Sequence, residues 1–170
     1  MVTVRVLDGA AGREHLNALA HVLVACVEGG ASVNFMSPYT HAEAKRFFES
    51  VLTEVEAGRR ILLGSFSGER LVGTIQVLLA MPPNQPHRGE IAKLLVAPEA
   101  RGAGIGAALM MVAERCAKEA HKTLLVLDTA NATAEALYER LGWTRVGAIP
   151  GYALMPDGVP CATTIFWKVI

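Results

Sequence analysis

A glycine-rich loop between a predicted strand and a predicted helix most constrains what this chain folds into. Residues 94–106 read LLVAPEARGAGIG, where Pro98 ends an apolar strand and three glycines precede an amphipathic helix. Glycine permits positive φ and lets a ligand approach the backbone closely. The unpaired N–H groups and positive dipole end of a helix start form a site for phosphate groups. The segment therefore predicts an α/β protein with an anion site at this junction.

The rest of the chain predicts one mixed α/β domain over residues 1–170. One helix is expected over Arg13–Glu28, where Gly29-Gly30 ends it, and a second from Thr40, which has capping-box spacing to Glu43. Strands are predicted at 2–7, 60–66, 71–80, 90–96, 123–128, 143–149 and 163–170, and further helices from 105 and over 131–141. The expected order is strand, two helices, three strands, helix, strand, helix and two strands.

Composition excludes several classes of protein. Lys plus Arg and Asp plus Glu both number 16, so zero net charge predicts no nucleic-acid partner and no anionic membrane partner. Three widely spaced cysteines without a CxxC pair predict free thiols and a cytoplasmic location, with Cys116 in the core. The sequence contains no run of about 18 consecutive apolar residues, so no membrane span is predicted. The histidines lack metal-ligand spacing, so no metal is expected.

Several interpretations compete for the glycine loop. A nucleoside triphosphate loop requires Lys-Ser or Lys-Thr after Gly106, and neither follows it. A dinucleotide site requires GxGxxG in a parallel βαβ unit, whereas GxGxG here follows antiparallel strands, although Asp128 lies near the expected acid position. A purely structural turn explains Gly104 and Gly106 but not the adjacent Arg101. Coenzyme A is the favoured ligand.

Two motifs resemble one known family. Residues 101–106, RGAGIG, resemble the acetyl-CoA pyrophosphate loop [QR]xxGx[GA] of the GNAT N-acetyltransferase superfamily. Residues 131–143, NATAEALYERLGW, resemble that family's NxxAxxLYExxGF stretch. The resemblance covers essentially the whole chain. It implies a GNAT fold, with a central mixed sheet splayed at the acetyl-CoA site and flanked by helices, and direct acetyl transfer to an amine in a ternary complex.

A narrower resemblance lies within that superfamily. Residues 29–33, 35–36, 127–129, 150–152 and 156–158 are similar to those of the tabtoxin-resistance acetyltransferases, which inactivate a β-lactam toxin. The resemblance suggests a small-molecule amine as acceptor, such as a β-lactam toxin or an amino-acid-like compound. It also suggests toxin resistance as a biological role.

The superfamily resemblance implies a set of cofactor-binding residues on one strand, the loop after it and a later helix. The set is Leu94, Leu95, Val96, Arg101, Gly102, Ala103, Gly104, Ile105, Gly106, Asn131 and Tyr138. Asn131 is also interpreted as a helix N-cap, because its position precedes a helical pattern. Tyr138 is also interpreted as a core aromatic, because it shares helical spacing with Leu137 and Leu141.

Acetyl transfer to an amine imposes its own requirements. A lysine-like amine with a pKa of about 10.4 must lose a proton, which needs a general base. A backbone N–H on the splayed strand is expected to stabilise the oxyanion, and the departing thiolate needs a proton. The resemblance gives that acid role to Tyr138. Glu90 and Asp128 are the expected bases, at opposite ends of parallel neighbours, with water relaying the proton; a solvated strand-end Glu and an Asx-turn Asp are the alternatives.

The acceptor pocket is expected between the first two helices and the last hairpin. Its candidate residues are Ser32, Asn34, Phe35, Met36 and Tyr152. Two other functions remain open, namely a coenzyme A sensor without catalysis and a module that binds another phosphate compound. The protein is expected to be a monomer or a homodimer, the latter through an exposed edge strand.

Overall fold

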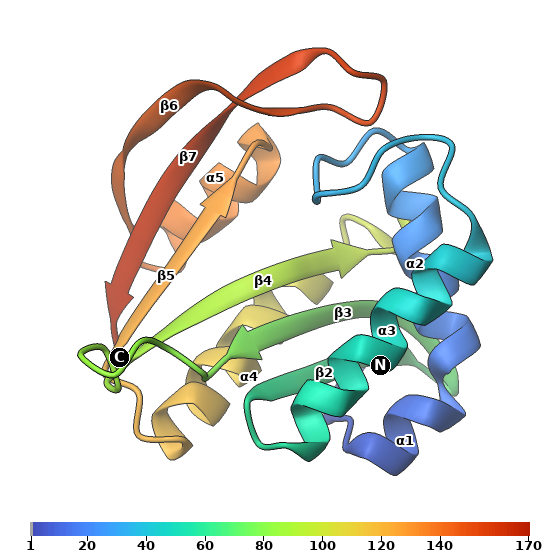
Figure 1. Ribbon diagram of the computed structural model, residues 1–170, viewed down its shortest axis with the longest axis horizontal. Helices are drawn as coiled ribbons and strands as arrows, with labels where there is room; N and C mark the ends of the chain where they lie inside the picture. Colours follow the sequence, from blue (N-terminus) through green and yellow to red (C-terminus); the bar gives the residue numbers. More distant parts are fainter. Residues whose placement is uncertain (1) are drawn as a thin grey trace.

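Seven strands form one sheet in the computed structural model, which describes residues 2–170 (Figure 1). The strand order is β1-β2-β3-β4-β5-β7-β6, in which β4 and β5 run parallel and the other neighbours run antiparallel. The strands are β1 (Val2–Val6), β2 (Arg60–Ser67), β3 (Arg70–Leu78), β4 (Arg88–Val96), β5 (Leu124–Thr129), β6 (Thr144–Leu154) and β7 (Pro160–Val169). The helices are α1 (Gly9–Glu14), α2 (Leu16–Glu28), α3 (His41–Glu56), α4 (Ile105–Glu119), α5 (Ala132–Arg140) and a short 3₁₀ helix at Pro98–Ala100. The predicted mixed sheet is confirmed.

Helices cover both faces of the sheet, and each face has its own hydrophobic core. α1, α2 and α3 pack on one face, here called the α2 face, where Leu19, Leu23 and Phe48 are fully buried. α4 and α5 pack on the other, here called the α4 face, where Leu109 and Tyr138 are buried. Cys116 belongs to the second core, as expected. Burial of these side chains is the main force that holds the helices on the sheet.

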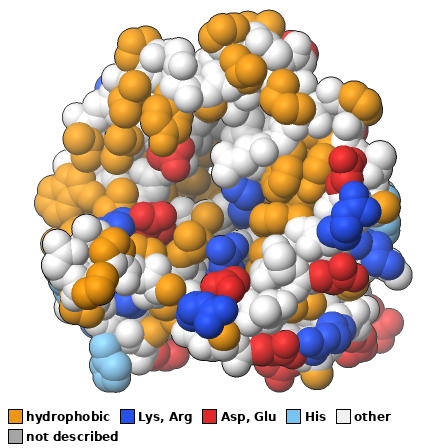
Figure 2. All heavy atoms as spheres, in the orientation of Figure 1, with side chains coloured by type: hydrophobic (Ala, Val, Ile, Leu, Met, Phe, Trp, Pro, Cys, Tyr) orange, Lys and Arg blue, Asp and Glu red, His pale blue; other side chains and the backbone are white. Residues whose placement is uncertain are grey.

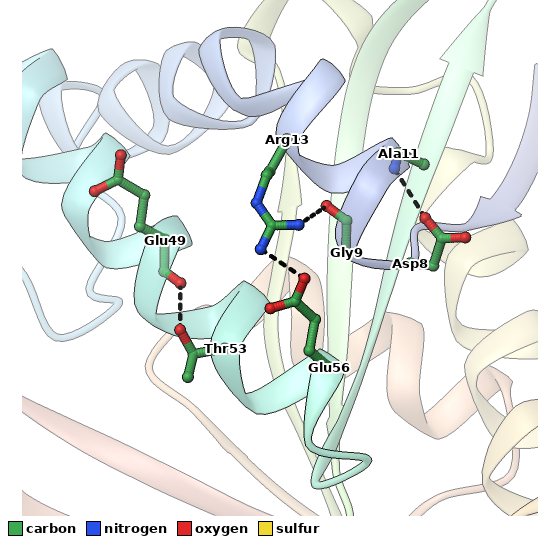
Figure 3. Close-up of polar contacts among 7 residues, drawn as sticks. All are labelled: Asp8, Gly9, Ala11, Arg13, Glu49, Thr53 and Glu56. Carbon is green, nitrogen blue, oxygen red and sulfur yellow. Dashed lines mark hydrogen bonds and ion pairs between the residues drawn. The ribbon is translucent and has the colours of Figure 1, made fainter.

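The single helix predicted from Arg13 is wrong, because the chain forms two helices that meet at His15. Asp8 caps α1 by accepting a hydrogen bond of 2.8 Å from the Ala11 N–H. Arg13 then ties α1 to α3 through an ion pair with Glu56 at 2.5 Å (Figure 3). α1 also contains two glycines, and a Cβ at Gly12 would lie 2.1 Å from a Leu52 methyl group. Glycine lowers helix propensity, but here it allows close packing against α3.

Most predicted boundaries agree with the structure. α2 ends at Glu28 with Gly29 as its C-cap, and both hydrogen bonds of the Thr40–Glu43 capping box are present. The last two strands are longer than predicted, because β6 continues to Leu154 and β7 begins at Pro160. The resulting hairpin extends beyond the sheet toward the α2–α3 connection (Figure 1).

β4 and β5 pair at one end only and then separate. Their ladder consists of the pairs Arg88–Leu124, Gly89–Leu125 and Glu90–Val126. β4 continues to Val96 against β3, whereas β5 continues against β7, so the two strands diverge (Figure 1). The closed end depends on Gly89, where a Cβ would lie 3.1 Å from the Leu125 side chain and 3.2 Å from the Leu78 carbonyl oxygen. The splay implied by the family resemblance is therefore present.

A bulge interrupts β4 just beyond the point of separation. Ala92 pairs with Gln76 and Leu95 pairs with Thr74, so two residues of β4 lie opposite Ile75 alone. Lys93 is the first of them and has a φ of 52°. Such a bulge re-aims a side chain and bends the strand.

No helix within residues 2–170 is long and apolar enough to cross a membrane. In the same range, no three His, Cys, Asp or Glu side chains are grouped so as to hold a metal ion.

Candidate active site

The glycine loop lies between the end of β4 and the start of α4, and its conformation fits an anionic ligand. Gly102 and Gly104 have φ values of 81° and 75°, which favour glycine. A Cβ at either position would meet no atom within 4 Å, so the loop is open to a ligand. Gly104 is the N-cap of α4, and no side chain caps this helix start. The first N–H groups of α4 therefore face outward with the positive end of the helix dipole.

Arg101, at the start of the loop, lies back against the strand that precedes it. Its Nε donates a hydrogen bond of 3.2 Å to the Val96 carbonyl oxygen, and its Nη2 lies 3.9 Å from Cys26 Sγ. Burial raises the pKa of the Cys26 thiol, and the nearby guanidinium offsets part of that shift. The predicted contact between Arg101 and a pyrophosphate stays a prediction.

The gap between β4 and β5 is bordered by backbone. Leu94 packs toward the α4-face core and Leu95 is buried in the α2-face core, so the main chain of residues 94–96 faces the gap. Beyond Glu90, the β5 side of β4 has no strand partner. A strand edge of this kind offers N–H and C=O groups to an extended ligand.

Asn131 and Tyr138 belong to α5, which follows β5. Asn131 Oδ1 accepts a hydrogen bond of 3.0 Å from the Ala134 N–H, so its interpretation as an N-cap is confirmed. Tyr138 packs against Phe166 at 5.6 Å and Trp143 at 6.2 Å between ring centroids, so its core interpretation is also confirmed.

The Tyr138 hydroxyl is protonated at neutral pH. Burial, followed by the nearby negative charge of Asp128, raises the pKa of this phenol well above its usual value. A buried, protonated phenol close to a carboxylate is a suitable proton donor.

Glu90 lies near the start of β4 and Asp128 near the end of β5, as expected, but the two carboxylates are not far apart along the strands. β5 is short and starts level with the start of β4, because Arg88 pairs with Leu124. Glu90 pairs with Val126, and Asp128 lies two residues further along β5. Since side chains alternate, Glu90, Val126 and Asp128 share the α2 face. The two carboxylates are offset along the strands by about 7 Å.

The two carboxylates differ in their partners. Glu90 forms an ion pair with Arg88 Nη1 at 2.5 Å. Asp128 is exposed, and its Oδ2 accepts a hydrogen bond of 2.9 Å from Thr163 Oγ1 of β7. Asp128 therefore has a fixed orientation but no cation within ion-pair distance in the part of the chain that the structure describes.

The α2–α3 connection and the β6–β7 hairpin meet above the sheet. The Ser37 N–H donates to the Pro156 carbonyl oxygen at 3.0 Å, and Ser32 Oγ donates to the Leu154 carbonyl oxygen at 3.2 Å. A pocket of about 360 Å³ lies at this junction, lined by Glu28, Ser37 and neighbouring residues. Figure 2 shows a hollow in the upper half of the molecule, below the hairpin, with Lys or Arg side chains at its lower rim. This hollow is called the acceptor cleft below.

The expected pocket residues occupy different positions around this junction. Phe35 packs against Tyr39 and Phe47 at 4.5 and 5.1 Å between ring centroids, so it forms a fixed wall. Ser32 contacts the hairpin, and Asn34 lies in a turn with a φ of 75°. Met36 and Tyr152 are exposed. Four of the five therefore lie in the α2–α3 connection, where Asn34 and Met36 are exposed, and Tyr152 is exposed on β6.

Comparison with known proteins decides the family. The model of the acetyltransferase (GNAT) family matches residues 24–143, which is well over half of the chain and includes both motifs. The chain belongs to the GNAT family of acetyltransferases. Its seven-stranded mixed sheet is the GNAT fold.

Individual relatives are distant. A mycothiol acetyltransferase from Salinispora arenicola is 38% identical over 73 residues, which is 41% of this chain and 24% of that protein. The chain therefore spans about a quarter of the length of that relative. An N-acetyltransferase structure from Staphylococcus aureus matches with a TM-score of 0.83 and 18% identity, over 99% of this chain and 98% of its own. An acetyltransferase from Salmonella typhimurium, solved with its cofactor acetyl-CoA, matches with a TM-score of 0.81 and 17% identity. That match covers 99% of this chain and 94% of the other.

Three polar residues of this GNAT enzyme were not predicted from the sequence. Lys93 lies at the β4 bulge, with its Nζ 5.7 Å from the centre of the Phe35 ring. Arg60, the first residue of β2, donates a hydrogen bond of 2.6 Å to Gln76 Oε1 on β3. Gln76 is fully buried. The sequence did contain one signal for this site, the lysine inside the apolar strand EIAKLLV, because charged residues are rarely buried in a central strand without a partner or a function.

The position of Lys93 lowers the stability of the folded protein, because its ammonium group is buried. Burial lowers the pKa of its ammonium group, Asp128 offsets part of that shift, and Arg60 adds to it. The unfolded chain therefore binds this proton more readily than the folded chain. The free energy of unfolding therefore rises with pH between the lowered pKa of Lys93 in the folded chain and its value of about 10.4 in the unfolded chain. Below that window, the buried ammonium charge lowers the stability of the folded protein by its full amount.

Replacing Lys93 by methionine removes this cost. We expect Lys93→Met to raise the melting temperature at pH 7 by about 2–4 °C, the shift that about 1 kcal/mol gives in a domain of this size. The gain should shrink as the pH approaches 10.4, where the lysine is neutral in both states. Thermal unfolding followed by circular dichroism measures it. Lys118→Met, on the exposed side of α4, is the matched control, and an equal gain in both variants would contradict the argument.

Proposed function

We propose that this GNAT enzyme transfers the acetyl group of acetyl-CoA to the primary amine of a small molecule, in a ternary complex. The observation that carries the proposal is the separation of β4 from β5 between an open glycine loop and the pair Asp128 and Tyr138. In the reaction, the amine nitrogen forms a bond with the thioester carbon, and the carbon–sulfur bond breaks. One proton leaves the amine, and one proton reaches the departing sulfur.

The loop and the gap are suited to hold the two ends of acetyl-CoA. The N–H groups of residues 102–106 would bind the pyrophosphate, with Arg101 adding a positive charge from the end of β4. The unpaired edge of β4 at residues 94–96 would bind the pantetheine arm by backbone hydrogen bonds. Asn131 lies at the opposite side of the gap, where its amide nitrogen remains available although its oxygen caps α5. Acetyl-CoA supplies an activated acyl group when bound.

Asp128 is the carboxylate best placed to accept the amine proton. Its charge acts on both Tyr138 and Lys93, so it lies near the proposed acid and near the lysine of the β4 bulge. Its hydrogen bond from Thr163 fixes the orientation of one oxygen and leaves the other free. Glu90 is offset from Asp128 by two residues along the strands and already forms an ion pair with Arg88. We therefore assign Glu90 an indirect role, in which water carries the proton between it and the amine.

Tyr138 supplies the second proton. Its hydroxyl is protonated because burial opposes the charged form, and its ring is fixed by Phe166 and Trp143. A fixed, neutral phenol can donate a proton to the departing thiolate. The backbone N–H groups at the β4 bulge, where the strand leaves β5, are the candidates for oxyanion stabilisation.

The acceptor is proposed to be small. The connection after α2 and the β6–β7 hairpin close over the cleft through the Ser37 and Ser32 contacts, which leaves room for a compound of limited size. The resemblance to tabtoxin-resistance acetyltransferases supports a β-lactam toxin or an amino-acid-like compound, with toxin resistance as the role. Three free cysteines support a cytoplasmic location. We expect a monomer or a homodimer.

Binding of acetyl-CoA is tested at Gly104. Gly104→Glu places a negative charge where the pyrophosphate would lie, so affinity for acetyl-CoA should fall by about 100-fold or more. The control is Gly58→Glu, because Gly58 also has a positive φ of 69° and open space around it, at the end of α3. Isothermal titration calorimetry with acetyl-CoA, ADP and NAD measures both. Equal affinity in the two variants, or equal binding of all three ligands, would overturn the loop assignment.

The acid role is tested at Tyr138. Tyr138→Phe keeps the ring and removes the hydroxyl, so kcat should fall by about 100-fold while acetyl-CoA affinity changes little. Release of free coenzyme A from acetyl-CoA, followed with a thiol reagent against a panel of primary amines, measures kcat. A variant with unchanged kcat would remove Tyr138 from the mechanism.

Replacing each carboxylate by the corresponding amide distinguishes the role of Asp128 from that of Glu90. Asp128→Asn should lower kcat by about 100-fold or more, whereas Glu90→Gln should lower it by about tenfold or less, because it acts through water. The pH profile of kcat/KM provides a second reading, since only loss of the base should remove its acidic limb. A larger effect for Glu90→Gln would reverse the assignment.

A further inference from the structure

Two basic side chains near the separation of β4 and β5 have no carboxylate within ion-pair distance among residues 2–170. They are Lys93, at the β4 bulge, and Arg60, at the start of β2. Their neighbours in the chain are paired, since Arg59 binds Glu54 and Arg88 binds Glu90. Lys93 and Arg60 therefore lack the counter-ions that Arg59 and Arg88 have.

A third group in the same place lacks a partner. Gln76 is fully buried, and its Nε2 has no hydrogen-bond acceptor. Its Oε1 must face Arg60, because a guanidinium only donates hydrogen bonds and the two groups are 2.6 Å apart. The amide N–H groups of Gln76 are then left for another acceptor. An enclosed donor without an acceptor costs free energy.

Strand register brings these groups to the side of the sheet where the reaction is proposed. Arg60 pairs with Leu78, which pairs with Glu90, and Gln76 pairs with Ala92. Paired residues share a face, so Arg60, Gln76 and Glu90 all project from the α2 face. Lys93 reaches the same face from the bulge, where it meets the Phe35 ring of the α2–α3 connection.

The charges around this place favour an incoming anion. Burial lowers the pKa of both Lys93 and Arg60, so neither cation is fully hydrated in the free protein. Glu54 and Asp128 are the carboxylates close enough to act on them, but Glu54 is paired with Arg59. An anion that accepts hydrogen bonds from both cations and from Gln76 would satisfy all three groups at once.

We propose that the acceptor carries a carboxylate near its amine, and that Lys93, Arg60 and Gln76 bind this carboxylate. The inference rests on the proposed function and narrows its substrate class to amino acids and compounds that contain the same pair of charges. The ammonium group of such a compound lies toward Asp128, which acts on Lys93 and has no cation in ion-pair contact among residues 2–170. Attraction at both ends orients the amine for transfer.

Matched acceptors test the proposal directly. α-Amino acids are compared with their own α-carboxamides, and β-alanine and γ-aminobutyrate vary the distance between amine and carboxylate. Coenzyme A release from acetyl-CoA gives kcat/KM for each compound. We expect each accepted acid to exceed its carboxamide by about 10- to 100-fold, since charge-assisted hydrogen bonds are lost in the amide.

Variants then assign the effect to residues. Lys93→Met and Arg60→Gln should each bring the ratio of acid to carboxamide toward one, mainly through KM for the acid, and Lys93→Arg should restore much of it. Lys118→Met, on the far side of the sheet, should keep the wild-type ratio. Circular dichroism confirms folding, and the two cation variants provide independent tests.

The outcomes separate the two proposals. Absence of coenzyme A release with every amine would overturn the proposed function. Calorimetric titration of acid and carboxamide into the protein with bound coenzyme A would then still test anion recognition. Turnover with equal use of acids and carboxamides, or a ratio unchanged in both cation variants, would overturn the carboxylate site and leave acetyl transfer intact.

Discussion

The short parallel ladder between β4 and β5 is the constraint on which the rest of this enzyme depends. Three residue pairs hold the strands together at one end, and Gly89 allows that contact because its neighbours leave no room for a side chain. From that point β4 follows β3 and β5 follows β7, so the separation of the strands is enforced by the two halves of the sheet. The gap between β4 and β5 is therefore formed by the course of the backbone and does not depend on particular side chains. It is the place where an extended, hydrogen-bonding ligand fits.

The groups proposed to carry the chemistry are arranged around that gap. The glycine loop lies at the end of β4, and α5 places Tyr138 beside β5. The bulge at Lys93 lies just beyond the separation, and it brings the lysine over the ring of Phe35 in the α2–α3 connection. Stability and function are opposed here, because Lys93, Arg60 and Gln76 are each incompletely satisfied in the free protein. Sites that bind charged substrates commonly retain such costs.

Local sequence predicted those elements whose signals are local. The Thr40–Glu43 capping box, the glycines after α2 and the GxGxG loop follow from hydrogen bonding and φ preferences within a few residues. α1 was missed because its glycines lower helix propensity, and its stability comes from packing on Leu52 and from the Arg13–Glu56 ion pair. The outer half of the hairpin was missed because β6 is exposed along its length, so burial left no alternating pattern. Tertiary contacts override weak local preferences in both places.

By itself, the sequence determined the fold class, the glycine loop and the family, because each depends on residues adjacent in the chain. Only the tertiary structure decided how far apart Glu90 and Asp128 lie, since that distance depends on the register of two strands more than 30 residues apart. It also decided the partners of Lys93, Arg60 and Gln76, which come from three strands and a loop. Register and bulges arise from packing across the whole sheet. For that reason the partners of these three residues could not be predicted from sequence, whereas the glycine loop and the family could.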